Sequence, residues 1–173
     1  MGLNARAFLL GLCAAVPFAS CGPSAPDQPR LVVLYVPCTV NRQQLSPYDP
    51  SVPFTPHFQR FADESLVFER HVTEAGQSGV AYASIFSGFQ ANGHGVYAHP
   101  KHVPDSMYLI TEAFRDNGYE TFAWDGHAIG SASLNSQGVD AENRFEIALG
   151  AEAPAFVEIL DKLESDPTYK AFV

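Results

Sequence analysis

The sequence predicts an α/β fold with a mostly parallel sheet flanked by helices. Hydrophobic residues make up 46% of the chain, which is enough to build a core and excludes a disordered acidic tail. A continuous apolar and β-branched run at residues 31–36 is typical of a buried parallel strand. Extended and helical patterns then alternate along the chain, the order expected when helices connect parallel strands.

The elements that follow this first strand are marked by caps and apolar runs. Thr55 and Pro56 indicate a helix start, as N-cap and first helical residue, with Phe58 and Phe61 facing one side. Residues 65–72, with Leu66, Phe68 and Val72, are expected to form a second strand.

The middle of the chain is expected to contain two helices. Residues 80–87 suit a short helix that Gly88 ends. Another helix is expected to begin at Asp105, with Asn117 and Gly118 as its C-cap.

The last part of the chain is expected to form a strand, a helix and a final strand. Residues 119–124 are rich in aromatic and β-branched side chains and indicate a strand. A helix is expected over residues 152–164, ended by Asp166 and Pro167. Its expected apolar face consists of Ala153, Phe156, Val157, Leu160 and Leu163. Residues 169–173 indicate a strand that has only begun where the sequence stops.

Charge and cysteine content exclude two classes of protein. The formal net charge is −9, and such an acidic balance argues against nucleic-acid binding, which needs clustered Lys and Arg. Three cysteines cannot form a disulfide scaffold. Loss of residues 1–20 would remove Arg6 and no acidic residue, and would change the formal charge from −9 to −10.

The N-terminus is expected to be a targeting segment. Residues 1–20 combine one basic residue with an apolar run too short to span a bilayer, which is typical of a secretory signal. Small residues before Cys21 resemble a bacterial lipobox, whose cysteine becomes lipidated. The alternative is an ordinary secretory signal with an incidental cysteine. Residues 21–30 are Pro-rich and suit a flexible tether. The protein is therefore expected to be exported and lipid-anchored to the bacterial cell envelope, on its periplasmic or surface side.

Ser78 is the candidate nucleophile. It stands beside a glycine at the mouth of the helix expected at residues 80–87, where backbone N–H groups and the helix dipole favour an anion. Such a site suits transfer of a sulfuryl or phosphoryl group. Spacing alone leaves a second interpretation open, in which Ser78 is an N-cap without chemistry. Cys38 and Thr39 follow the first strand, at the end where open α/β sheets form ligand sites.

Four short motifs resemble, in order and spacing, those of the sulfatase family, within the alkaline phosphatase superfamily. They are Thr55-Pro56-His57-Phe58, Ala83-Ser84-Ile85-Phe86-Ser87-Gly88, Gly93-His94-Gly95-Val96 and Asn117-Gly118-Tyr119-Glu120-Thr121. The resemblance covers residues 31–130. It implies that residues 31–173 are the N-terminal part of an incomplete catalytic domain, which follows the expected signal peptide at residues 1–20 and the tether at residues 21–30.

The resemblance also implies Ser78 as the nucleophile, because it stands six residues before the serine of the Ala-Ser-Ile motif. Family members use formylglycine, made from a cysteine or serine, or an unmodified serine or threonine. Val80 and Tyr82 occupy the Pro/Ala and Arg positions of the maturation motif, which argues against formylglycine. Tyr82 also replaces a cation by a neutral hydrogen-bond donor. An unmodified serine suits phosphoryl transfer better than sulfate ester hydrolysis.

A divalent metal is a further implication of the resemblance, with Cys38, Thr39 and Ser78 at the ligand positions. The family's metal is calcium, which prefers hard oxygen ligands to a thiolate. Zinc would suit Cys38 better. Two alternatives remain open, a metal site that is lost or rebuilt and a Cys38 that is only a small buried residue.

Histidines supply the remaining candidates. His127 is the candidate general acid or anion contact, because histidine titrates near neutrality. Asp125 is a weaker candidate metal ligand. His94 is expected to hold its turn, whereas His99 and His102 flank a surface loop with a spacing that chance explains.

The resemblance predicts a hydrolase that cleaves a sulfate or phosphate ester of a small molecule or glycan. The alternative is a catalytically degenerate lipoprotein that binds an anionic glycan or another envelope component. A third reading treats the chain as a fragment that lacks activity by itself, since the family's remaining metal ligands and a lysine would follow Val173.

Overall fold

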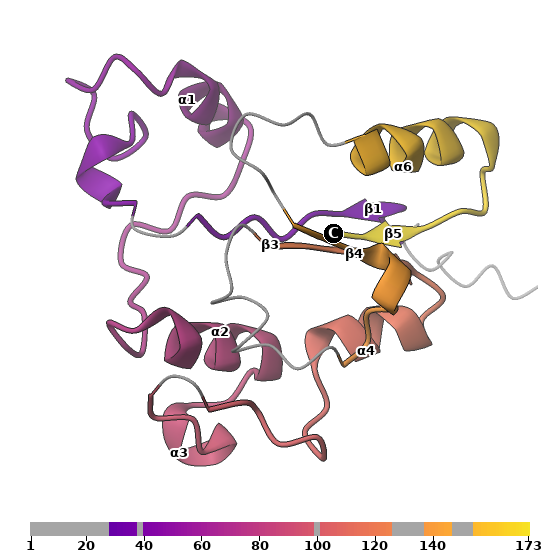
Figure 1. Ribbon diagram of the computed structural model, residues 1–173. Coiled ribbons are helices and arrows are strands. Elements are labelled where there is room, and N and C mark those ends of the chain that lie inside the picture. Colours follow the sequence, from indigo (N-terminus) through magenta and orange to yellow (C-terminus); the bar gives the residue numbers. More distant parts are fainter. Residues whose placement is uncertain (1–27, 38–39, 99–100, 126–136, 147–153) are drawn as a thin grey trace, which may run out of the picture.

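The computed structural model describes residues 28–37, 40–98, 101–125, 137–146 and 154–173. Helices and two small parallel sheets make up this part of the chain (Figure 1). The predicted α/β class is therefore confirmed. Among the described residues, no helix combines the length and apolar character needed to cross a membrane.

The larger sheet has three parallel strands in the order β1-β5-β2. They are β1 (Leu31–Val32), β5 (Ala171–Phe172) and β2 (Glu120–Thr121), and Ala171 lies in register with both Leu31 and Glu120. The expected strand at the end of the chain is thus the central one. A smaller sheet pairs β3 (Ala123–Asp125) with β4 (Arg144–Glu146), also in parallel.

The helices cover both faces of the larger sheet. They are α1 (Pro56–Asp63), α2 (Ser78–Ser87), α3 (Ala91–His94), α4 (Ile110–Asp116) and α6 (Pro154–Ser165), with 3-10 turns η1 (Arg42–Gln44) and η2 (Ala141–Asn143). Figure 1 shows α6 on one side of the strands and α4 on the other. On the α4 side, the rings of Phe114 and Phe172 stack with centroids 4.2 Å apart.

Two apolar clusters form the core. One consists of Ala83, Val96, Val103 and Leu109, and the partly buried Phe86 and Met107 pack against it. The other centres on Phe122, Ile159 and Ala171 between α6 and the sheet, with a surrounding layer that includes Leu31, Trp124 and Phe145.

Three helix boundaries agree with the capping signals. Thr55 is the N-cap of α1 and Pro56 its first residue, Gly88 is the C-cap of α2 with φ 71°, and Asn117 is the C-cap of α4. The expected start at Asp105 is wrong. Helix α4 begins at Ile110, because the Glu112 carboxylate accepts the N–H of Leu109 at 2.9 Å and so caps the chain there.

The predicted strand at residues 65–72 is wrong. This stretch has no regular secondary structure, and Leu66 and Val72 are 81% and 84% exposed. A strand needs a neighbour to take its backbone hydrogen bonds, and none of the described strands pairs with this stretch.

Burial differs from expectation at three other places. Only Leu31–Val32 of residues 31–36 pairs as a strand, and Val33 and Tyr35 are exposed because the described elements leave that face open. The expected strand at 119–124 is divided between β2 and β3. On α6 the most buried side chain is Ile159, 1% exposed, which the predicted face omitted.

On α1 the expected apolar face also stays uncovered. Phe58 and Phe61 are both exposed in the described part of the chain. Val157 and Leu160 of the predicted α6 face are exposed as well, because that helix presents Phe156, Ile159 and Leu163 to the sheet.

Candidate functional site

The candidate site lies at the N-terminus of α2. Gln77 is the N-cap, since its carbonyl accepts the N–H of Ala81 at 3.1 Å, and Ser78 is the first helical residue. Ser78 is therefore not the N-cap. Its half-buried side chain lies where the helix dipole and the first-turn N–H groups favour an anion, which is the arrangement that a nucleophile on a sulfuryl or phosphoryl group requires.

Tyr82 lies one turn after Ser78 on the same face of α2 and is also half-buried. Gly79 and Val80 are buried, which fixes the inner face of this first turn. The structure thus brings together two of the predicted site residues, Ser78 and Tyr82.

The C-terminal half of α2 is held by a partly buried contact between a serine and a histidine. Ser84 Oγ and His94 Nε2 are 3.0 Å apart, and the Val96 N–H donates to His94 Nδ1 at 3.1 Å. Because Nδ1 accepts, a neutral His94 carries its proton on Nε2 and donates it to Ser84. Burial lowers the pKa of His94, against the opposing effect of the Glu74 carboxylate. His94 is therefore a structural residue, as expected, and cannot act as a base towards Ser84.

The chain that leads into Ser78 is attached to the same helices. The Glu74 carboxylate accepts the N–H of Ala91, the first residue of α3, at 2.8 Å. Gly95 follows α3 with φ 70°, a conformation that favours glycine, and places Val96 in the core beside Ala83. The Ala-Ser-Ile-Phe-Ser-Gly and His-Gly-Val motifs thus form one packed unit that supports α2.

The Gly-Tyr-x-Thr motif also has a structural role, because its residues form a turn and hold neighbouring segments. Gly118 adopts φ 79°, the Tyr119 hydroxyl donates to the Pro29 carbonyl at 2.5 Å, and the Thr121 hydroxyl donates to the Gly138 carbonyl. A Cβ on Gly138 would lie 2.5 Å from the Glu112 backbone nitrogen, so glycine is required there. Gly138 could not be recognised from the sequence, because its contact with Glu112 joins distant parts of the chain.

Sequence reasoning also missed a polar cluster at the other end of the sheet. The Tyr169 hydroxyl and the Lys162 ammonium donate to Glu120 Oε2 at 2.6 and 3.1 Å. Burial raises the pKa of Glu120, but these hydrogen bonds outweigh it and hold the pKa below its usual value. Burial and the bond to Glu120 raise the pKa of Tyr169. The cluster lies where β2 and β5 begin, away from the carboxyl ends where ligand sites form, and its role is to join α6 to the sheet.

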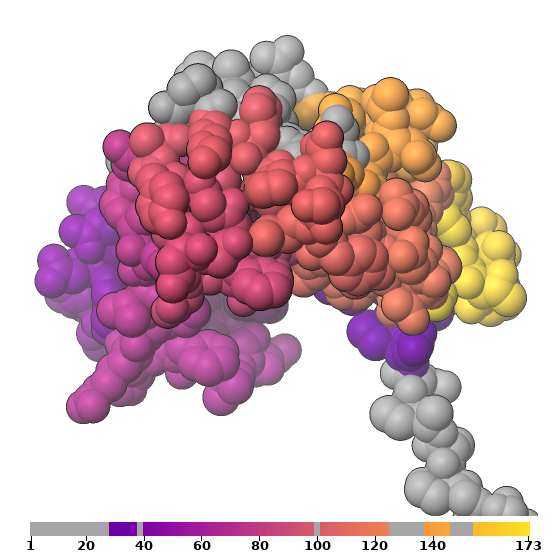
Figure 2. Space-filling model, turned by 90° about the horizontal axis from the view of Figure 1, so that it is seen from below, coloured from indigo at the N-terminus to yellow at the C-terminus, as the bar shows by residue number. Residues whose placement is uncertain are grey.

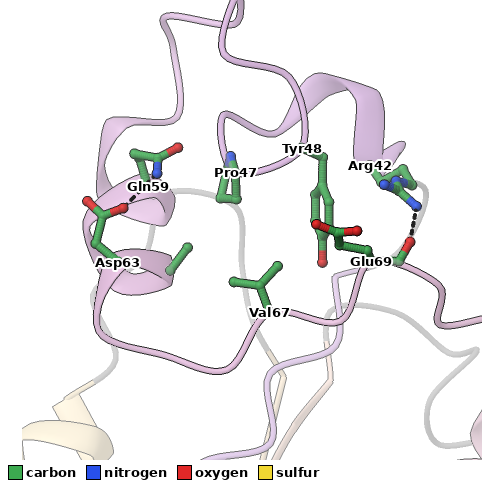
Figure 3. A pocket seen from close by; sticks show the side chains of 8 residues that line it. Arg42, Pro47, Tyr48, Gln59, Asp63, Val67 and Glu69 are labelled. Atoms are coloured by element: carbon green, nitrogen blue, oxygen red, sulfur yellow. Dashed lines mark hydrogen bonds between the residues drawn. The ribbon is translucent and has the colours of Figure 1, made fainter.

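A hollow of about 280 Å³ lies between η1 and α1 (Figure 3). It is lined by Arg42, Pro47, Tyr48, Gln59, Ala62, Asp63, Val67 and Glu69, none of them a predicted site residue. Its polar groups already pair with their neighbours: Arg42 donates to the Glu69 carbonyl at 2.6 Å and Gln59 to Asp63 at 2.8 Å. The hollow is therefore separate from the site at Ser78.

Several predicted site residues lie outside the described part of the chain. Cys21, Cys38, Thr39 and His127 belong to this group, and Asp125 is described only as a residue of β3. The residues that are described contain no group of three or more His, Cys, Asp or Glu side chains that could hold a metal.

Comparison with known proteins adds one match. A family model described as Sulfatase matches residues 32–150, which is more than half of the chain. The match begins at Val32, the second residue of β1, and includes α1, the whole α2–α4 region, β3 and β4. No curated protein and no solved structure matches the chain.

Proposed function

Because the chain belongs to the sulfatase family, whose general class is the alkaline phosphatase superfamily, we propose that it is an ester hydrolase with Ser78 as nucleophile. Its substrate would be a sulfate or phosphate ester of a small molecule or glycan. The observation that carries the proposal is the position of Ser78, the first residue of a ten-residue helix within the matched range.

The surroundings of Ser78 support this role. The Glu74 bond to Ala91 and the Ser84–His94 contact fix the chain before and after the first turn of α2, so the serine is held on a rigid element. A nucleophile fixed in this way loses little entropy when the ester binds. The backbone N–H groups of the first turn would receive the oxygen atoms of the transferred group.

The proposed reaction uses an unmodified serine. Val80 and Tyr82 stand in place of the small or proline residue and the arginine of the formylglycine motif. The Ser78 hydroxyl oxygen attacks the central sulfur or phosphorus atom, and the bond to the ester oxygen breaks. His127 is proposed to protonate the leaving oxygen, since histidine can hold a proton near neutrality.

Sulfatases typically bind a divalent metal, which polarises the ester group and acidifies the nucleophile. We assign Cys38, Thr39 and Ser78 as its protein ligands in this chain. A thiolate among the donors would favour zinc over calcium, because calcium prefers oxygen.

A lipid anchor on Cys21 would place this hydrolase at the bacterial envelope. The proposal rests on the small residues that precede Cys21 and on the Pro-rich stretch after it. Membrane fractionation of the gene product tests it: replacement Cys21→Ser should release the protein from the membrane fraction, and unchanged membrane association would contradict the anchor.

The second candidate function is a degenerate sulfatase that binds an anionic glycan without cleaving it. Tyr82 favours this alternative, because the cation that the family uses near the transferred anion is absent at its usual position.

Hydrolysis of 4-nitrophenyl sulfate and 4-nitrophenyl phosphate by the full-length gene product separates the two candidates. Ser78→Ala should lower kcat/KM by about 10³-fold or more, since it removes the attacking atom. Ser165→Ala, the same change at the end of α6, should leave the rate unchanged. A Ser78→Ala enzyme as active as the wild type would contradict the nucleophile, and a wild type that binds glycan without turnover would favour the degenerate lectin-like protein.

A further inference from the structure

The chain enters the fold at the end of the larger sheet where the strands begin. The Tyr119 hydroxyl, directly before β2, donates to the Pro29 carbonyl at 2.5 Å. The N–H of Ala171, the first residue of β5, donates to the Arg30 carbonyl at 2.8 Å, directly before β1. These two bonds hold the entering segment against the amino ends of all three strands.

Arg30 fastens this entry point to the last turn of α6. Its Nη2 donates to the carbonyls of Leu163 and Asp166, both at 2.5 Å, and its Nε donates to the Tyr169 carbonyl at 3.3 Å. The last carbonyls of a helix lack partners within the helix, and the negative end of the helix dipole favours a cation there. The Arg30 side chain therefore joins the segment before β1 to the C-terminal end of α6.

The candidate nucleophile lies at the opposite end of the sheet. In Figure 1, α6 ends at the right, where β5 begins, whereas α2 begins at the left, beyond the mark C that follows β5. Ser78 is the first residue of α2. It therefore lies on the side of the carboxyl ends of the strands, where open α/β sheets form ligand sites.

The stretch between the proposed lipid anchor and the fold is short compared with the domain. Seven residue steps lead from Cys21 to Gln28, and they span at most about 25 Å when fully extended. A domain of about 145 residues has a radius of gyration of about 15 Å, which corresponds to a width of about 40 Å. A stretch of this length cannot pass from one end of the domain to the other, so the anchored domain cannot turn its far end to the membrane.

From these contacts and this geometry we infer that residues 28–30 act as a strap that orients the anchored domain, with the Ser78 site directed away from the membrane that holds Cys21. The substrate is then a water-soluble ester, because the lipid esters of the anchoring bilayer lie at the other end of the domain. The inference rests on the proposed lipid anchor, and it narrows the substrate class of the proposed hydrolase.

Energy transfer to a labelled bilayer tests the orientation. The full-length gene product, purified with its anchor, is reconstituted in phosphatidylcholine vesicles that contain rhodamine-labelled phosphatidylethanolamine. A fluorescein donor is attached through Glu164→Cys, in the last turn of α6, or through Gln77→Cys, beside Ser78. Both of these side chains are exposed. The change Cys38→Ser in both proteins leaves a single thiol for the label, since Cys21 carries the lipid.

We expect the donor at residue 164 to lose a larger share of its fluorescence to the bilayer than the donor at residue 77, because energy transfer falls steeply with distance. Insertion of about twenty Gly and Ser residues between Asp27 and Gln28 should remove this difference, because a flexible linker of that length lets the domain take any orientation.

A matched pair of variants tests the strap itself. Arg30→Ala should bring the two readings closer together, since it detaches the entering segment from α6. Arg60→Ala, the same change on the exposed surface of α1, should leave both readings as they are without it. A contrast that Arg30→Ala leaves unchanged would overturn the role of the strap.

Two further results would overturn the inference. Equal transfer from the two labels, or more transfer from residue 77, would disprove the orientation in protein that stays bound to the vesicles. Protein that does not associate with the vesicles would contradict the lipid anchor, and the orientation with it. Because no reading depends on turnover, a failure of Ser78 as nucleophile would be recognised separately in the ester assays.

Discussion

Two neighbouring regions of the chain use the same local signals and reach opposite degrees of burial. The α2–α4 unit (residues 77–118) buries Ala83, Val96, Val103 and Leu109 to 1% exposure or less. In the α1 segment (residues 40–76), Phe61 is 73% exposed and Leu66 is 81% exposed. Figure 2 shows the α2–α4 unit as a continuous face, with part of the α1 segment projecting beside it.

The two regions differ in burial because their side-chain hydrogen bonds join different parts of the chain. In the α2–α4 unit, Ser84 of α2 meets His94 of α3, and the Thr111 hydroxyl of α4 donates to the Gln137 carbonyl, so these helices are joined to other parts of the chain. In the α1 segment the main side-chain hydrogen bonds stay within the segment, such as Ser46 to Thr55 and Arg42 to the Glu69 carbonyl. Caps and turns can start a helix in either region. The apolar face of that helix is buried only if a second element from another part of the chain packs against it.

The largest expected effect comes from truncating one side chain in each region. Leu109→Ala should lower the free energy of unfolding by about 2–5 kcal/mol, because it removes a fully buried side chain and leaves a cavity. Phe61→Ala should change it by no more than about 0.5 kcal/mol, since the ring is largely in water. Chemical denaturation followed by the fluorescence of Trp124, the one tryptophan of the chain, measures both.

Equal losses for the two variants would contradict the comparison. A large loss for Phe61→Ala would show that the α1 segment is packed in the folded protein. A small loss for Leu109→Ala would show that the cluster of Ala83, Val96, Val103 and Leu109 contributes little.

The same distinction explains which parts of the fold the sequence could predict. Gly88, Asn117 and Pro56 act within their own turn, and the sequence placed each helix end that they define. The strand expected at residues 65–72 failed because a strand depends on a partner, which local pattern does not specify. Ile159 was missed for a related reason, since the sheet decides which face of α6 is buried.

For the candidate site, sequence reasoning reached the residues of one helix but not their support. Ser78 and Tyr82 share a face of α2 by helical spacing alone. The Glu74 bond to Ala91 and the Gly138 contact with α4 join residues 17 or more positions apart, and no local periodicity encodes them. Cys38, Thr39 and His127 remain predictions, because they lie outside the described residues.

An intermediate effect is expected from adding one methyl group at two glycines. Gly138→Ala should cost about 2–3 kcal/mol, because φ is 78° and the new Cβ would lie 2.5 Å from the Glu112 nitrogen against α4. Gly76→Ala, in the α1 segment, has open space and no left-handed backbone, so it should be neutral or stabilise by a few tenths of a kcal/mol up to about 1 kcal/mol. Thermal unfolding of both variants measures the contrast, and a neutral Gly138→Ala would show that this approach to α4 is not close in solution.

The smallest expected effect is the dependence of the free energy of unfolding on pH that arises from the buried His94. Burial lowers the pKa of His94 in the folded protein, so below about pH 6.5 the unfolded chain binds a proton that the folded chain does not. Stability from this source is complete above that pH and is lost as pH falls from about 7 towards the folded pKa. Lowered carboxyl pKa values, such as that of Glu120, act only at more acidic pH.

His94→Asn should therefore flatten the dependence of the denaturation midpoint on pH between about 7 and 5.5, although it lowers the midpoint itself. Asparagine keeps an oxygen to accept the Val96 N–H but has no titrating group. His71→Asn, a matched change in the exposed α1 segment, should leave the slope as it is in the wild type. An unchanged slope in His94→Asn would mean that the protons taken up on unfolding bind to other residues. The two regions would then not differ in how acid affects their stability.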